Sequence, residues 1–345
     1  MTILIPSYEP DERLLALVGS LKEVSSDPIL VVDDGSGERY RTIFDSLEKT
    51  GCTVLTHRSN QGKGSALKTG FDYVRRQGGG EGVVCADSDG QHLPGDILRI
   101  TEAVREHRRH IVLGSRQFTG KVPMRSRFGN SATRMVYALA TGRPVQDTQT
   151  GLRGYSSDML DWLCEVPGER FEYEMNMLLE APQAGYGLVE VPIDTVYLED
   201  NKSSHFRPLA DSARVYFPFL KFCASSGFAA IVDFSLLLLL QWLTSSLLLS
   251  VIGARLCSSI FNYTMNRRMV FDPGNKAAIR KSLPRYFSLV LVIVLLNYGL
   301  MLLFHSGIGI PLVAAKLMTE ASLFLFSYWA QRQFVYALEA KATDC

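Results

Sequence analysis

The feature that most constrains the fold is a change in composition near residue 210. Before it, charged residues are spread throughout the chain. After it come four apolar segments, near residues 220–242, 245–264, 286–305 and 311–330. Each is about 20 residues long, the length that an α-helix needs to cross the hydrocarbon core of a bilayer. We therefore expect a soluble α/β part followed by an all-α domain of four transmembrane helices.

The segment between the two parts has a mixed character. Residues 208–220 combine charged side chains with aromatic ones, which is typical of a helix lying at a membrane surface. We therefore divide the 345-residue chain into four parts. These are a soluble domain over 1–207, an interfacial amphipathic helix over 208–220, a transmembrane domain over 221–335 and a cytoplasmic tail over 336–345.

The loops of the apolar half predict its orientation. Lysine and arginine are concentrated between the second and third apolar segments, whereas the turns near Thr244 and Ser306 carry neither. Because positively charged loops stay in the cytoplasm, the middle loop and both ends of the bundle should lie there. No signal-peptide pattern opens the chain. We expect an integral protein of the plasma membrane, with the soluble domain and both termini cytoplasmic.

Net charge and cysteine usage exclude several classes. The formal net charge is +1, so nothing indicates nucleic acid as a partner. The six cysteines are scattered without a CxxC pair, which indicates neither a disulfide framework nor a zinc site.

Strand-like and helix-like segments alternate in the soluble half. We expect strands over 2–5, 29–33, 53–57, 82–86, 111–114 and 186–193, and helices over 10–24, 38–49, 63–77, 95–108 and 127–141. This alternation predicts a mostly parallel sheet covered on both faces. Ligands of such sheets bind at the carboxyl ends of the strands.

Two acids follow the strand over 82–86. Asp87 and Asp89 are two residues apart in an extended segment, so their carboxylates point the same way, and Gln91 continues the alternation. Three hard oxygen donors at a strand end suit Mg²⁺ or Mn²⁺ held together with the phosphates of a substrate. The alternative from these residues alone is a solvated acidic turn.

Four motifs together carry a family resemblance. The segments 5–9 (IPSYE), 31–36 (VVDDGS), 60–64 (NQGKG) and 87–92 (DSDGQH) resemble family 2 glycosyltransferases of GT-A fold. Within that family they are most similar to dolichol-phosphate mannose synthases and bacterial polyprenyl-phosphate glycosyltransferases. The resemblance covers about residues 1–210, and the apolar half resembles the GtrA-like membrane family. It implies a GT-A (Rossmann-like) catalytic domain.

The resemblance also implies roles for single residues. The nucleotide sugar would be bound by Pro6, Tyr8, Glu9, Asp34, Lys63, Asp87 and Asp89. Mn²⁺ or Mg²⁺ would be held by Asp87, Asp89 and Gln91. The phosphate of a lipid acceptor would be bound by Arg116, Arg127, Ser131 and Arg207, and the residues most directly tied to catalysis would be Asp89, Arg116 and Arg207.

The function that follows is an inverting, metal-dependent transfer of a hexose from a GDP- or UDP-sugar to a polyprenyl phosphate such as dolichyl or undecaprenyl phosphate. By resemblance GDP-mannose is favoured, while UDP-glucose and UDP-N-acetylglucosamine stay open. Asp89 or Asp147 acting as a general base stays open too. The chain could form a homo-oligomer. The alternative function is a lipid-linked sugar translocator whose soluble half only binds substrate.

Overall fold

The computed structural model describes residues 1–116, 133–134, 137–138, 141, 144–194, 208–271 and 279–336. The chain divides into two compact units. The first contains residues 1–138 and 143–215, and the second contains residues 139–142 and 216–345.

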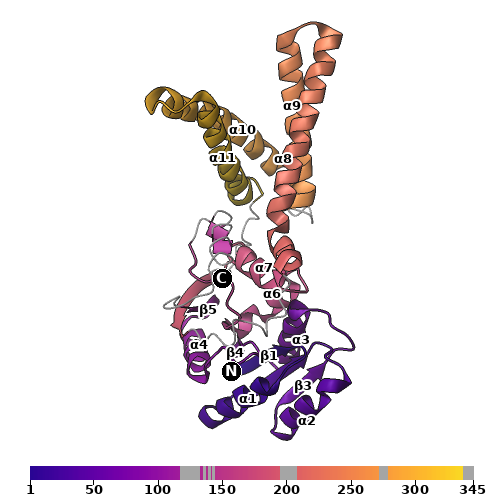
Figure 1. Cartoon of the computed structure of the whole chain (residues 1–345), viewed down its shortest axis with the longest axis vertical. Coiled ribbons are helices and arrows are strands. Elements are labelled where there is room, and N and C mark those ends of the chain that lie inside the picture. The colour runs from indigo at the N-terminus through magenta and orange to yellow at the C-terminus, as the bar shows by residue number, and fades with distance from the viewer. Residues whose placement is uncertain are drawn as a thin grey trace. The chain divides into compact units, whose positions relative to one another are not determined.

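The first unit is built on a seven-stranded sheet in the order β3-β2-β1-β4-β6-β5-β7 (Figure 1). Its strands are β1 Thr2–Ser7, β2 Ile29–Asp33, β3 Thr53–Thr56, β4 Gly82–Cys85, β5 His110–Arg116, β6 Arg153–Ser156 and β7 Gly187–Ile193. Its α-helices are α1 Glu12–Val24, α2 Arg41–Lys49, α3 Lys63–Arg76, α4 Pro94–Glu106, α6 Leu160–Glu165 and α7 Glu172–Glu180, with short 3-10 turns η1 Glu38–Tyr40 and η2 Ser157–Met159.

The expected α/β class is confirmed. The strands and helices expected within residues 1–116, and the strand expected over 186–193, are present within a few residues of their predicted bounds. The sheet is mostly parallel, but β6 pairs antiparallel with both β4 and β5. This strand was not expected, because its sequence Arg-Gly-Tyr-Ser lacks β-branched residues.

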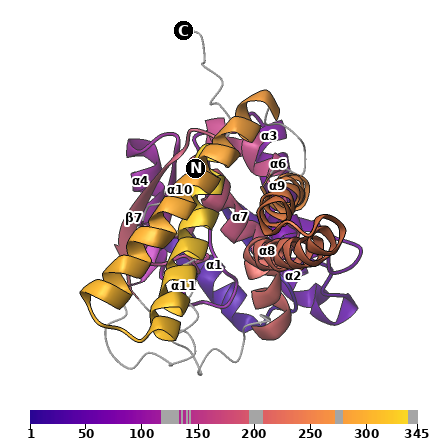
Figure 2. The ribbon, with the colours of Figure 1, turned by 90° about the horizontal axis from the view of Figure 1, so that it is seen from above.

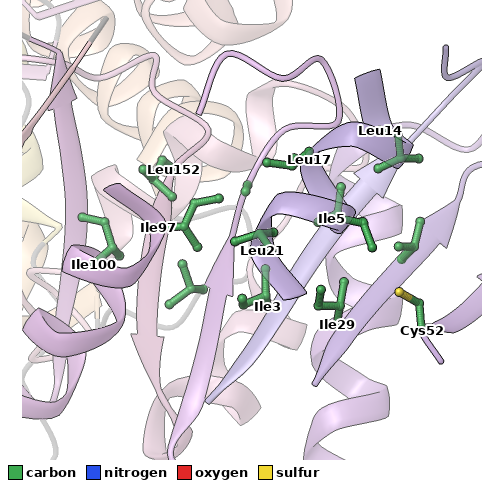
Figure 3. Close-up of a cluster of buried hydrophobic side chains, with 14 of the residues drawn as sticks. Ile3, Ile5, Leu14, Leu17, Leu21, Ile29, Cys52, Ile97, Ile100 and Leu152 are labelled. Carbon is green, nitrogen blue, oxygen red and sulfur yellow. The ribbon is translucent and has the colours of Figure 1, made fainter. Parts of the chain in front are cut away.

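One face of the sheet packs against α1 and α4 (Figure 3). Leu14, Leu17 and Leu21 recur at helical spacing on α1 and are at most 5% exposed. They pack with Ile3 and Ile5, the alternate side chains of β1, in one core cluster. Figure 3 shows side chains of α1, α4 and the strands meeting in this layer. The apolar side chains that recur at helical spacing on α1 and those that alternate along β1 therefore enter the same hydrophobic layer between the helix and the sheet.

The other face is covered by α3, which approaches the sheet closely at a glycine. A Cβ at Gly70 would overlap the side chain of Leu4 on β1. The next residue, Phe71, packs edge-on against Tyr155 of β6, with ring centroids 5.5 Å apart. Because α1 and α3 lie on opposite faces, the chain reverses its winding direction between β1 and β4. Ligands of doubly wound sheets bind outside the carboxyl ends of the strands at such a point.

The second unit is helical. It contains most of α8 Pro208–Thr244, then α9 Leu247–Met265, α10 Ile279–Met301 and α11 Leu312–Ala330, with π-helical turns η4 Asn266–Phe271, η5 Leu302–Gly307 and η6 Gln331–Val335. These four helices coincide with the four expected apolar segments. Helices α8 and α9 run side by side, and so do α10 and α11 (Figures 1 and 2). The expected interfacial helix 208–220 continues into the first apolar segment as one α-helix.

Two stretches of the described chain are long and apolar enough to cross a membrane, Leu220–Thr244 and Ile279–Gly307. Large apolar side chains on both are turned outward: Trp242 is 79% exposed and Tyr298 is 69% exposed. Such outward-facing apolar side chains are expected of helices surrounded by lipid rather than water.

Candidate active site

Asp87 lies two residues beyond the end of β4, and its carboxylate is the centre of the site. Its Oδ1 lies 2.7 Å from Lys63 Nζ, and its Oδ2 lies 3.4 Å from His92 Nε2. Burial raises the pKa of Asp87, but the Lys63 ammonium and the His92 side chain lower it by more, so the net pKa is well below its ordinary value. The side chain is still 31% exposed, which leaves it within reach of a ligand.

Lys63, the first residue of α3, contacts a second carboxylate as well. Its Nζ lies 3.1 Å from Glu174 Oε1 on α7, and the Lys63 side chain is 17% exposed. Burial lowers the pKa of Lys63, but the charges of Asp87 and Glu174 raise it by more, so the net pKa lies above its ordinary value. Lys63 therefore keeps its positive charge between the two carboxylates.

A glycine brings Lys63 and Glu174 together. A Cβ at Gly64 would lie only 2.6 Å from the Cβ of Tyr173, so the first turn of α3 can pack against the start of α7 only without a side chain there. The backbone N–H of Ser65 donates to the carbonyl of Glu169 at 2.8 Å, which joins the same two segments. The NQGKG motif thus sets the position of its lysine as well as the course of its loop.

Arg153 is the first residue of β6, and its side chain connects the segment 148–150 to α7. It is 1% exposed and donates to three backbone carbonyls: from Nη2 to Thr148 at 3.0 Å, from Nε to Thr150 at 2.8 Å and from Nη1 to Glu174 at 2.7 Å. Its Nε also lies 4.0 Å from Glu174 Oε1. Nothing in the local sequence pattern indicated this role, because the three acceptors are backbone groups from two separate segments.

Asp89 and Gln91 follow Asp87 in the same turn. Asp89 Oδ1 accepts a hydrogen bond from the backbone N–H of Gln91 at 3.1 Å. Burial and, after it, the charge of Asp87 raise the pKa of Asp89. Because the negative charges of the two carboxylates repel each other, a bound cation would stabilise both of them.

The donor set at this turn fits a divalent ion that is bound together with a substrate. Within the described residues no three His, Cys, Asp or Glu side chains are grouped as a complete metal site. Asp87, Asp89 and the amide of Gln91 are hard oxygen donors, and Mg²⁺ is usually held by one or two carboxylates plus phosphates and water. The residues present therefore suit a divalent metal whose remaining ligands are water or phosphate oxygens.

Gly151 leaves room for the Asp87 carboxylate. A Cβ at residue 151 would overlap the carboxylate of Asp87. Gly151 therefore has a steric role at the acidic motif.

Asp34 lies beneath the NQGKG loop. The residue is 2% exposed, and its Oδ1 accepts from Gln61 N at 2.9 Å and contacts His57 Nδ1 at 2.8 Å. Its Oδ2 accepts from Gly62 N at 2.7 Å, and His57 Nε2 is 2.9 Å from the Thr69 hydroxyl. The structure thus engages both oxygens of Asp34 in holding the loop, and the expected contact of Asp34 with the nucleotide sugar stays a prediction.

The residues after β1 lie beside the residues after β2. The Ser36 hydroxyl donates to Asp33 Oδ1 at 2.6 Å and accepts from Glu9 N at 2.8 Å. Glu9 adopts a φ of 50°, which is uncommon for a residue other than glycine. Burial and a hydrogen bond with Glu9 raise the pKa of Tyr8. Pro6 lies near the end of β1, and Tyr8 and Glu9 follow the strand. All three residues are therefore at the carboxyl edge of the sheet, where we expect the nucleotide sugar to bind.

Arg116 ends β5 and is paired with Asp147. Its Nε is 2.6 Å from Asp147 Oδ2 and its Nη2 is 3.0 Å from Oδ1, a bidentate arrangement. Asp147 is 0% exposed and also accepts from the backbone N–H of Gln149 at 3.1 Å. A fully buried carboxylate bound to an arginine is a poor general base, so this geometry argues against that role for Asp147 and fixes the plane of the Arg116 guanidinium.

Three expected acceptor-side residues, Arg127, Ser131 and Arg207, lie outside the described residues, as does most of the helix expected over 127–141.

Arg170 is a polar residue at this edge that the sequence did not single out. Its Nη1 donates to Asn60 Oδ1 at 3.1 Å, and its side chain packs where a Cβ at Gly62 would stand. Arg170 therefore supports the NQGKG loop from the α7 side. In the sequence Arg170 is distinguished only by its position two residues before the start of α7.

Two family models match this chain. The family model described as "Glycosyl transferase family 2" matches residues 2–161, and the one described as "GtrA/DPMS, transmembrane domain" matches residues 221–336.

Several curated proteins are similar to the soluble half. A polyprenol monophosphomannose synthase of Mycolicibacterium smegmatis is 30% identical over 202 residues, which are 55% of this chain and 75% of that protein. A UDP-N-acetylglucosamine–dolichyl-phosphate N-acetylglucosaminyltransferase of Methanococcus voltae is 29% identical over 216 residues, 57% of this chain and 86% of that protein. An undecaprenyl-phosphate mannosyltransferase of Micrococcus luteus is 29% identical over 209 residues, 58% and 85% of the two chains. The chain belongs to glycosyl transferase family 2, with a GtrA/DPMS-type transmembrane domain joined to its catalytic domain.

Proposed function

We propose that this chain transfers a hexose from a nucleoside diphosphate sugar to a polyprenyl phosphate. The observation that carries the proposal is the Lys63–Asp87 pair with Asp89 beside it, at the carboxyl end of β4, in a family 2 domain joined to a membrane domain. Of the three similar proteins named above, two are named for mannose and one for N-acetylglucosamine, but all three are named for a polyprenyl-type phosphate. The acceptor class is therefore better supported than the donor, for which GDP-mannose remains our first choice.

The acceptor is suited to direct displacement. A phosphate monoester has a second pKa near ~6, so its oxygen is already an anion at neutral pH and needs little help from a general base. That oxygen would attack the anomeric carbon while the sugar–diphosphate bond breaks, which inverts the configuration. The electron pair of the broken bond leaves with the nucleoside diphosphate.

The protein's task is then to hold two anions in line. Arg116, whose orientation Asp147 fixes, is proposed to bind the acceptor phosphate together with Arg127, Ser131 and Arg207. A divalent ion on Asp87, Asp89 and Gln91 would neutralise charge on the departing diphosphate. Pro6, Tyr8, Glu9, Asp34 and Lys63 are proposed to help bind the nucleotide sugar.

A release assay tests this reaction and identifies the donor. Purified chain in detergent with Mn²⁺ or Mg²⁺ is given UDP-glucose, UDP-N-acetylglucosamine or GDP-mannose, each with and without a polyprenyl phosphate. We expect nucleoside diphosphate release from one donor, dependent on both the lipid and the metal. Release that does not depend on the lipid would contradict the proposed acceptor.

We also propose that all four helices α8–α11 cross the plasma membrane, with the catalytic domain and both termini in the cytoplasm. The lysine- and arginine-rich loop before α10 supports this orientation. In a chain whose native cysteines are replaced by serine, Ser306→Cys should react with an impermeant maleimide in intact cells. Arg280→Cys should react only after lysis. The opposite pattern would invert the topology.

A further inference from the structure

The Lys63 ammonium occupies an oxygen that a metal at this site would use. Its Nζ is 2.7 Å from Asp87 Oδ1, and the other oxygen of Asp87 faces His92 at 3.4 Å. A divalent cation and an ammonium on the same carboxylate repel each other. A metal bound to Asp87 would therefore weaken the contact between Asp87 and Lys63.

Glu174 offers Lys63 an alternative partner that is already in place. Its Oε1 is 3.1 Å from Lys63 Nζ, so the ammonium can leave Asp87 and keep a carboxylate partner. Glu174 is 8% exposed, and Arg153 holds the backbone of Glu174 by a 2.7 Å hydrogen bond. Because α7 is fixed in this way, Glu174 can retain the lysine without moving itself.

We propose that Lys63 is an exchangeable counter-ion of the metal site. In the free protein it neutralises Asp87, and when a divalent ion binds, it withdraws from Asp87 and stays on Glu174. Glu174 is then a positioning residue that keeps the ammonium available but clear of the metal. This inference rests on the proposed function, because it takes Asp87 and Asp89 as the metal-binding acids.

The proposal predicts opposite effects of two substitutions at neighbouring groups. Lys63→Met removes the competing ammonium, so metal should bind more tightly, by about tenfold. Glu174→Gln removes the alternative partner, so Lys63 should remain on Asp87 and metal should bind more weakly, by about threefold or more. If Lys63 and Glu174 served only to support the local fold, both substitutions would weaken metal binding.

The experiment is a titration of the purified full-length protein in detergent with Mn²⁺ alone, in which electron paramagnetic resonance reports the free ion. The proteins are the wild type, Lys63→Met, Glu174→Gln and the double variant. Lys68→Met is the matched control, because Lys68 lies on the same helix with its ammonium 5.0 Å from the Tyr173 ring centroid. The control should bind Mn²⁺ like the wild type.

The double variant separates exchange of the lysine from general electrostatics. If Glu174 acts through Lys63, Glu174→Gln should have little effect once Lys63 is methionine. Unchanged or weaker Mn²⁺ binding by Lys63→Met would overturn the proposal, and so would an equal effect of Glu174→Gln in both backgrounds or no Mn²⁺ binding by any variant. The titration uses neither sugar nucleotide nor lipid. The expected pattern in a protein that transfers no sugar would therefore reject the proposed function and leave this inference standing.

Discussion

Replacing Asp89 by alanine is expected to reduce sugar transfer by about a thousandfold or more while leaving the fold intact. Asp89 lies four residues beyond the end of the buried strand β4, close enough to Asp87 for the charge of Asp87 to raise its pKa. Removing it leaves one carboxylate, already paired with Lys63, to bind the metal. The departing diphosphate would then lose the group that neutralises its charge.

The measurement is the initial rate of nucleoside diphosphate release in the presence of polyprenyl phosphate. Asp161→Ala is the matched control, since Asp161 is an 82% exposed acid of the same domain. The control should transfer sugar at the wild-type rate, and circular dichroism should show the same helix content in all three proteins. Turnover of Asp89→Ala near the wild-type rate would remove the assignment of the metal to this turn.

The second large effect concerns stability. Arg153→Met should lower the free energy of unfolding of the soluble domain by about 3–5 kcal/mol, because it leaves three buried carbonyls without their donor and removes one of the two cations near Glu174. For a domain of this size such a loss lowers the melting temperature by about 10 °C.

Thermal unfolding followed by near-ultraviolet circular dichroism measures this effect. The control is Arg105→Met, which removes an exposed arginine whose Nη2 lies 2.9 Å from Glu81 Oε2 and should leave the melting temperature close to that of the wild type, because exposed ion pairs add little stability. A melting temperature of Arg153→Met within about 1 °C of the control would show that the buried network contributes little.

Much of the fold of the first unit could be predicted from the sequence, because the apolar residues of its helices and of its strands recur at the spacing typical of each element. Leu14, Leu17 and Leu21 follow the helix period and Ile3 and Ile5 follow the strand period, and both sets enter one core. Strand β6 could not be predicted in this way. Its arginine is buried because carbonyls from Thr148, Thr150 and Glu174 surround it, and such contacts between distant segments have no local pattern.

The sequence predicted those parts of the site that depend on a local pattern and missed those that depend on contacts between distant segments. The alternation of Asp87 and Asp89 after an apolar strand already places two carboxylates together. That Lys63 lies between Asp87 and Glu174, more than a hundred residues from the latter, depends on the close packing of Gly64 against Tyr173. For Asp34 the motif predicts a contact with the nucleotide sugar, which stays a prediction, and the structure adds hydrogen bonds from Gln61 and Gly62 that no local pattern indicates.

The most direct test of the central claim is the mass of the lipid product. The wild-type protein and Asp89→Ala are each incubated with a polyprenyl phosphate, Mn²⁺ and the donor that supports release, and the lipids are analysed by mass spectrometry. The account predicts a lipid heavier than the acceptor by one hexose or N-acetylhexosamine residue, formed by the wild type and not by the variant. An unchanged lipid with the wild-type protein, whose fold and Mn²⁺ binding are intact, would contradict it and favour the translocator.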